Sequence, residues 1–203
     1  PGEEVGDYEI SPDGNRVVYR VENLPVGDLY SVLAGGGAST MLNTVSGSVI
    51  SALTENSITS DSSRVIFLAD EDGSAGNELY SVPIAGGPLT RLDTGPIANE
   101  TFYALAPDGS RIAVSNGAQL YTVPVTGGAP VSLNAAPVTG GVDSAQFTAD
   151  SNFVYYRADE DGIGNREWHR AAATGGTPEL WSTAVVTGGI EQGPENDRIY
   201  YYG

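Results

Sequence analysis

A six-residue phrase recurs along the chain at intervals of 42 to 48 residues. Its fullest form contains a proline, an aspartate, a glycine and, two residues after the glycine, an arginine. The five copies are Ser11–Arg16, Thr59–Arg64, Ala106–Arg111, Thr148–Phe153 and Gly193–Arg198. Proline presets φ, the aspartate side chain bonds nearby backbone and glycine accepts a positive φ, so each copy predicts a tight turn. Repetition at this period is typical of an array of like structural units.

A second phrase follows the first at the same place in each unit. It reads Leu-Tyr, then Ser or Thr, then Val, and a Gly-Gly pair comes a few residues later. The copies are Leu29–Val32, Leu79–Val82, Leu120–Val123 and, in altered form, Trp168–Ala171. Two phrases in a fixed order, repeated four times, predict four units of one fold.

Each unit is predicted to hold four short strands. In the third unit, Phe102–Ala106 precedes the turn and Arg111–Ser115 follows it. Asn116-Gly117, a strong hairpin signal, leads to a third strand at Ala118–Val123. A short outer strand at Val131–Asn134 ends the unit. Glycine or proline interrupts the chain every few residues without a 3.6-residue period, so we expect almost no helix.

The middle strands of a unit are apolar at consecutive positions, as in Val65–Leu68 and Val154–Tyr156. Such strands are covered on both faces, which sheets stacked face to face around an axis achieve. Four strands per unit at this period indicate a β-propeller. We therefore predict an all-β fold, a β-propeller of four-stranded antiparallel blades, with four complete repeats and two strands of a fifth. The predicted repeats span approximately residues 5–50, 51–98, 99–141, 142–187 and, in part, 188–203.

The phrase Ser-Pro-Asp-Gly-x-Arg, followed by a β-rich run, Leu-Tyr-x-Val and Gly-Gly, resembles the TolB-like propeller repeat, also called PD40 and WD40-like. The resemblance extends over essentially the whole chain. The copy at Thr148–Phe153 departs from it, because it lacks the proline, the glycine and the arginine. The resemblance implies a propeller from an exported protein. Repeats of this family occur in periplasmic translocation proteins, in propeller domains of prolyl-oligopeptidase-type peptidases and in long exported proteins.

The fifth unit stops after two predicted strands, and the predicted arc leaves blade faces and strand edges uncovered. Three arrangements would cover them. The chain is an excerpt of a longer propeller, or a second chain completes the ring or continues the array, or the four and a half units close on themselves.

The composition excludes several classes of function. The chain has 26 acidic residues against 9 basic ones, a formal net charge of −17, so it lacks the positive surface that nucleic acids require. Its apolar runs are far shorter than a membrane-spanning helix, so we expect no membrane insertion. It has no cysteine, hence no disulfide, thiolate metal site or cysteine nucleophile. An acidic, lysine-free surface suits an extracellular or periplasmic protein.

Two acidic loops occupy the same place in the second and fourth units, between the second and third strands. They begin Asp-Glu-Asp-Gly and lead to an asparagine and a glutamate before the third strand. Clustered carboxylates suit Ca²⁺, which makes Asp70, Asp72, Asp159 and Asp161 candidate calcium ligands. The loops do not match EF-hand spacing, and the simpler interpretation is a solvated acidic hairpin loop in which aspartate and glycine serve the turn geometry. We expect no other cofactor.

Other candidates have simpler structural explanations. His169 is the only histidine, and it takes the place of a strand tyrosine in the other units, so we expect a packed strand residue and no catalytic residues. The aspartate three residues before the arginine of the turn phrase, as in Asp13 and Arg16, predicts an ion pair that locks the turn. Tyrosines are favoured at interfaces, which makes Tyr200, Tyr201 and Tyr202 candidate partner-binding residues, although they also suit blade packing.

The regular repeat, without a unique reactive group of residues, predicts a non-catalytic extracellular propeller that acts as a protein-interaction or assembly module. We expect a protein partner or self-association, including polymeric surface structures. The first alternative is the propeller domain of a larger prolyl-oligopeptidase-like serine hydrolase. The second alternative is a calcium-stabilised adhesion module.

Overall fold

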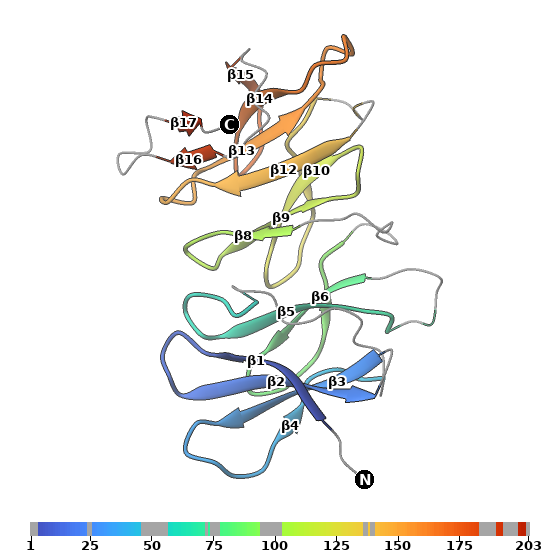
Figure 1. Cartoon of the computed structure of the whole chain (residues 1–203), viewed down its shortest axis with the longest axis vertical. Coiled ribbons are helices and arrows are strands. Elements are labelled where there is room, and N and C mark those ends of the chain that lie inside the picture. The colour runs from blue at the N-terminus through green and yellow to red at the C-terminus, as the bar shows by residue number, and fades with distance from the viewer. Residues whose placement is uncertain are drawn as a thin grey trace. The chain divides into compact units, whose positions relative to one another are not determined.

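The computed structural model describes residues 4–23, 26–45, 57–71, 73, 78–93, 103–135, 138, 141–182, 190–192 and 199–201. All regular elements within these ranges are β-strands, as predicted (Figure 1). Within the same ranges, no helix is long and apolar enough to cross a membrane.

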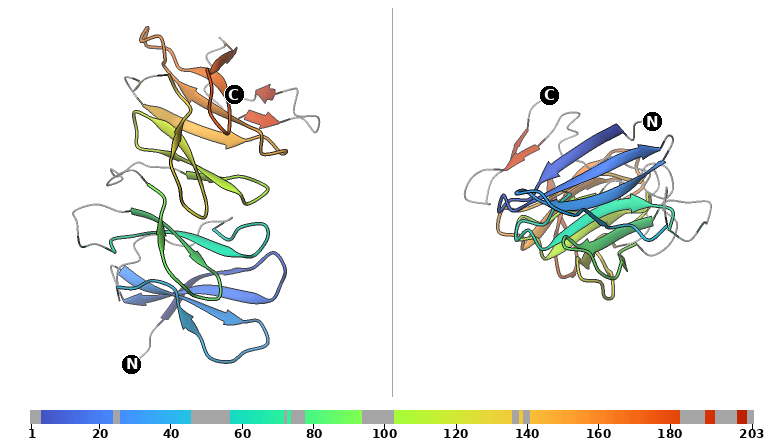
Figure 2. Two further views of the ribbon diagram at one scale, coloured as in Figure 1. Left: turned by 180° about the vertical axis from the view of Figure 1, so that it is seen from behind. Right: turned by 90° about the horizontal axis from the view of Figure 1, so that it is seen from below.

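The strands form successive antiparallel sheets that follow the order of the chain (Figure 2). The first blade has the order β1-β2-β3-β4, with β1 at Glu4–Ile10, β2 at Arg16–Asn23, β3 at Val26–Leu33 and β4 at Thr40–Met41. The second contains β5 at Arg64–Ala69, β6 at Glu78–Pro83 and β7 at Thr90–Arg91. The third contains β8 at Tyr103–Leu105, β9 at Arg111–Ser115, β10 at Leu120–Pro124 and β11 at Val131–Ser132.

The fourth blade is again four-stranded, and a strand pair follows it. The blade contains β12 at Val142–Phe147, β13 at Phe153–Ala158, β14 at Glu167–Ala172 and β15 at Glu179–Ser182. The last pair joins β16 at Ile190–Gln192 to β17 at Ile199–Tyr201. The second blade departs from the prediction of four strands, because in the described residues its first strand is reduced to one bridge between Ile58 and Val65.

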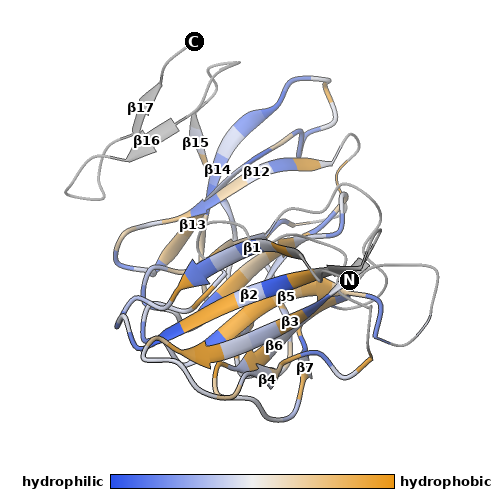
Figure 3. Ribbon diagram, turned by 60° about the horizontal axis from the view of Figure 1, so that its bottom comes forward, coloured by the Kyte–Doolittle hydropathy of each residue, from blue (hydrophilic) through white to orange (hydrophobic). Residues whose placement is uncertain are grey.

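The described strands belong to two compact units, of which the first holds β1 to β7 and the second β8 to β17. In the first unit, Val18 and Leu29 of the first blade share a buried cluster with Val65, Phe67 and Val82 of the second. Strands of these two blades carry apolar residues over much of their length, whereas the turns are hydrophilic (Figure 3). Burying each such side chain contributes about 1.5–3 kcal/mol. Face-to-face packing therefore holds the two sheets together.

The second unit has a core of the same kind. Ala113 and Leu120 of the third blade share a buried cluster with Val154, Tyr156 and Ala171 of the fourth. Within each unit, alternate residues of the middle strands pack against the neighbouring blade. The residues between them, such as Ile66 and Tyr155, are also buried, so the middle strands are buried at consecutive positions, as the sequence pattern predicts.

The Gly-Gly pairs let a blade approach the outer strand of the blade before it. A Cβ atom on Gly86 would lie 2.6 Å from Cγ2 of Thr40, and one on Gly175 would lie 2.5 Å from Cγ1 of Val131. Both glycines also have a positive φ, +90° and +95°. Glycine is required here for space and for conformation. In the first blade, the equivalent Gly36 has nothing within 4 Å of such a Cβ atom.

The aspartate of the turn phrase stabilises the turn by accepting hydrogen bonds from a hydroxyl group and a backbone amide, and not by pairing with the arginine. Oδ1 of Asp13 accepts hydrogen bonds from Oγ of Ser11 (2.6 Å) and from the backbone N–H of Asn15 (3.0 Å). Nη1 of Arg16 instead donates to Oγ of Ser31 on β3, at 3.0 Å. The predicted Asp–Arg pair is therefore wrong, because the arginine at the start of the second strand extends sideways to the third strand. Arg64 and Arg111 do the same toward Ser81 and Thr122.

Two serines stand where the first and third turn phrases have glycine. Ser62 and Ser151 have φ values of 59° and 61°, in the left-handed region that side chains rarely adopt. Oγ of Ser62 accepts a hydrogen bond from the backbone N–H of Asp13 at 3.0 Å, and Oγ of Ser151 accepts one from that of Asp108 at 3.0 Å. Each bond joins the two neighbouring blades of one unit.

Candidate functional site

The first blade leaves apolar side chains exposed at positions that the second and fourth blades bury. Ile10, at the end of β1, is 56 % exposed, whereas the equivalent Ile58 and Phe147 are 3 % and 4 % exposed. Val5 and Tyr8 of the same strand are also exposed. In the second and fourth blades the preceding blade of the same unit covers the position of Ile10, because Ile58 and Phe147 belong to the buried clusters that the two blades of a unit share. We call Val5, Tyr8, Ile10 and the turn at Gly36 the open face; Val5, Tyr8 and Ile10 pair with Val21, Tyr19 and Val17 of β2 and so project from one face of the sheet.

A second feature is a cavity of about 400 Å³ at the loop between β13 and β14. Its lining is acidic on one part and apolar on another, and consists of Glu160, Asp161, Ile163, Asn165, Glu167, His169 and Leu180. Glu167 and His169 are alternate residues of β14, so their side chains project from one face of the strand.

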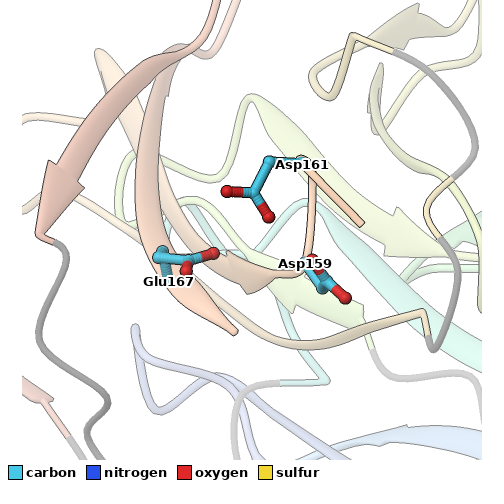
Figure 4. Close-up of side chains that lie close together, drawn as sticks. All are labelled: Asp159, Asp161 and Glu167. Atoms are coloured by element: carbon cyan, nitrogen blue, oxygen red, sulfur yellow. The ribbon is translucent and has the colours of Figure 1, made fainter. Parts of the chain in front are cut away.

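Three carboxylates meet at this loop: Asp159, Asp161 and Glu167 each offer an oxygen within 4.8 Å of the others (Figure 4). Asp159 accepts hydrogen bonds from the backbone N–H groups of Gly162 (2.8 Å) and Gly164 (2.9 Å), which fix the loop around it. Asp161 accepts one from Ile163 at 3.1 Å. Backbone amides therefore orient two of the three acids, while Glu167 is held by its strand.

The spacing of these oxygens is compatible with a calcium ion. Ca²⁺ binds oxygens at about 2.3–2.6 Å, so two ligands on opposite sides of the ion lie about 5 Å apart. The three residues would supply three of the six to eight oxygens that Ca²⁺ takes. Calcium at this loop stays a hypothesis.

The structure treats the four predicted calcium ligands differently. Asp159 and Asp161 come together with Glu167. Asp70 is half-buried, its Oδ1 has no hydrogen-bond partner, and it joins no comparable cluster among the described residues. Asp72 lies outside the described residues. Sequence reasoning did not single out Glu167, although its place directly before the third strand, like that of Glu78, was a usable signal.

His169 is a packed residue of β14, as predicted, and only 7 % exposed. Its ring stacks on that of Tyr156, with centroids 5.3 Å apart. The hydroxyl group of Tyr156 donates to Oε1 of Glu160. Burial, and then this hydrogen bond, raise the pKa of Tyr156 well above its ordinary value. Nε2 of His169 is buried and has no hydrogen-bond partner among the described residues.

The candidate partner-binding tyrosines are placed only in part. Tyr200 and Tyr201 belong to β17, where the backbone alone is described, and Tyr202 lies outside the described residues. The two tryptophans pack within the fourth blade. Trp168 is buried, and the ring of Trp181 lies edge-on to Tyr155 and 4.4 Å from the guanidinium carbon of Arg170.

No known family model and no curated protein matches this sequence. Solved structures do match. A protein from Agrobacterium tumefaciens described as a TolB is 16 % identical with a TM-score of 0.57, over 98 % of this chain and 69 % of that one. TolB from Acinetobacter baumannii is 13 % identical with a TM-score of 0.55, over 97 % of this chain and 48 % of that one. A prolyl endopeptidase is 12 % identical with a TM-score of 0.63, over 97 % of this chain and 32 % of that one.

These likenesses and the blades together define the class of protein. The chain is a β-propeller segment with the TolB-like architecture that its repeated phrases predict. It spans about half of the Acinetobacter protein and a third of the endopeptidase. At such low identity the likeness establishes the fold alone.

Proposed function

We propose that this chain is a non-catalytic assembly module of an exported protein, and that its open face binds a second copy of the chain. The observation that carries the proposal is the exposure of Ile10, 56 % against 3 % and 4 % at the equivalent Ile58 and Phe147. An apolar position that like blades bury against a neighbour is suited to accept a neighbour here as well.

The outer strands of this chain are surfaces that a Gly-Gly turn such as the one in the open face can contact. Within a unit, the turn at Gly86 or Gly175 receives a β-branched side chain, Thr40 or Val131, from the outer strand of the preceding blade. The turn at Gly36 has the same positive φ, +88°, and open space in front of it. A second copy would present outer strands of the same type.

Two further observations favour a role without catalysis. A serine-hydrolase triad needs a histidine whose ring nitrogen bonds the nucleophile. The only histidine of the chain is His169, whose Nε2 is buried and unbonded within the described part of the chain. In addition, the acids of the turn phrases recur in blade after blade and bond their own turns, as structural residues do.

The net charge of the chain predicts how its self-association depends on salt concentration. At −17, two copies repel each other at long range, and salt screens that repulsion. Association through an apolar face is therefore expected to strengthen as salt is raised.

Sedimentation velocity over a range of protein concentrations tests the proposal. The wild-type chain should associate as concentration rises, and Ile10→Lys should remain a monomer because it places a charge in the apolar contact. Val45→Lys is the matched control, because Val45 is also apolar and exposed but lies after β4, outside the open face. A wild-type chain that stays monomeric up to about millimolar concentration, well above the Kd of a specific interface, would overturn the proposal.

The likeness to a prolyl endopeptidase supports one alternative, a propeller domain of a larger serine hydrolase. A fluorophosphonate probe, which labels activated serines, distinguishes the two functions when applied to the natural polypeptide that contains this chain. Labelling outside residues 1–203 would support the hydrolase. An unlabelled, folded polypeptide that associates through the open face would support the assembly module.

A further inference from the structure

Each blade carries a polar residue directly before the buried Leu or Trp of its third strand. The four residues are Asp28, Glu78, Gln119 and Glu167. Three of them have a partner in the same blade. Asp28 accepts from Nδ2 of Asn43 at 2.9 Å, Glu78 lies 3.9 Å from Nη2 of Arg91, and Gln119 donates to Oγ of Ser132 at 3.3 Å.

Glu167 is the exception in the described part of the chain. Its side chain has no hydrogen-bond or ion-pair partner there, although the residue is only 8 % exposed. Strand register shows what is missing. In the second blade Tyr80 pairs with Arg91, and in the fourth blade the equivalent His169 pairs with Leu180. Leu180 thus stands where the second blade has Arg91, so the fourth blade has no arginine at this position. A largely buried carboxylate without a cation beside it is unfavourable.

The place of the missing cation is open space. Glu167, Asp161 and Glu160 line the cavity of about 400 Å³ beside this strand. Ile163 and Leu180 give it an apolar wall, and His169, whose buried Nε2 has no partner among the described residues, also lines it. The cavity therefore has negatively charged groups on one side and, on the other, an apolar wall that an aliphatic side chain can cover.

We propose that this cavity binds the guanidinium group of an arginine side chain from a partner protein. The planar guanidinium offers five N–H donors to carboxylate oxygens, and its three methylene groups would lie along Ile163 and Leu180. The second blade contains the internal counterpart, because Arg91 approaches Glu78 and also donates to Oδ2 of Asp93 at 2.8 Å.

The size and lining of the cavity favour an arginine over a bare metal ion. A single Ca²⁺ with its ligands at about 2.5 Å would leave most of this volume and its apolar wall unused. The site lies on the fourth blade, away from the open face in the sequence, so it neither requires nor implies self-association.

Calorimetric titration of the whole chain with N-acetyl-arginine methylamide tests the site. Binding should weaken by about tenfold or more in Glu167→Gln, because the buried charge is lost. It should be unchanged in Glu179→Gln, which removes a charge from the same blade outside the cavity. The neutral analogue N-acetyl-citrulline methylamide should bind about tenfold more weakly than the arginine probe. Failure of the arginine probe to bind would overturn the inference, and binding of CaCl₂ alone, lost in Glu167→Gln, would reassign the site to a metal.

Leu180→Arg provides a test that does not depend on a ligand. It places in the fourth blade the arginine that the second blade has in the same register. We expect a higher melting temperature than wild type and loss of arginine-probe binding, and no rise in melting temperature when Glu167→Gln is present as well. A variant that is folded but no more stable, and that binds the probe as wild type does, would contradict the inference. Melting temperature and probe binding are measured at protein concentrations at which the chain is monomeric. Their outcome is therefore independent of the assembly proposal.

Discussion

At the scale of single residues, Ser62 and Ser151 show how a local cost is offset by a bond between blades. Both adopt a left-handed backbone where the turns of the first and third blades use Gly14 and Gly109. A non-glycine residue in this region costs about 1 kcal/mol. The hydroxyl group of each serine accepts an amide of the blade before it, which offsets that cost.

Replacing Ser151 by alanine keeps the Cβ atom and the backbone cost but removes the hydroxyl group. The N–H of Asp108 then loses its acceptor, so the free energy of unfolding should fall by about 1–2 kcal/mol. Ser151→Gly should be less harmful, because it also removes the backbone cost. Urea denaturation measures both, with the exposed Ser110→Ala as control. Equal stability of Ser151→Ala and wild type would show that the bond contributes nothing.

The turn aspartates predict how the protein responds to acid. The hydrogen bond from the Ser11 hydroxyl, followed by those from Asn15, lowers the pKa of Asp13 from 3.8 to about 2. The folded pKa lies below the unfolded one, so the contribution is complete above pH 3.8 and is lost as the pH falls toward 2. Hydroxyl hydrogen bonds from Thr59 and Thr148 lower the pKa of Asp61 and Asp150 in the same direction.

Ser11→Ala should therefore raise the pKa of Asp13 toward 3.8, as followed by the carboxyl ¹³C shift during a pH titration. Asn134→Ala, in the third blade, should leave that pKa where it is. An Asp13 pKa that stays near 2 in Ser11→Ala would assign the shift to another cause.

At the scale of elements, the Gly-Gly turn and the outer strand of the preceding blade form the repeated contact. Gly86→Ala should cost about 1 kcal/mol for its positive φ and about 1–3 kcal/mol more for the contact with Thr40. Gly36→Ala is matched in φ but meets nothing within 4 Å, so at low protein concentration it should show the first cost alone. Thermal unfolding of the two variants measures the difference. Equal losses in both would indicate that the blades do not pack as described.

At the scale of the molecule, the periodic features could be predicted from the sequence and the features that depend on strand register could not. Turn phrases, hairpins and doubly buried strands follow from short-range patterns, and the structure contains them. The partner of Arg16 did not follow, because spacing along a turn does not say toward which strand a side chain extends. That Glu167 lacks a cationic partner could not be predicted either, since it depends on Leu180 lying opposite His169. Ile10 looks like Ile58 in the sequence, and only packing distinguishes them.

Hydrogen–deuterium exchange of the wild-type chain at low and high protein concentration tests directly whether the open face is an interface. We expect the added protection at high concentration to fall on β1 and on the turn around Gly36, and Ile10→Lys to abolish it. Protection that is unchanged by concentration, or that rises on the other blades while β1 stays as it was, would show that the open face is not an interface.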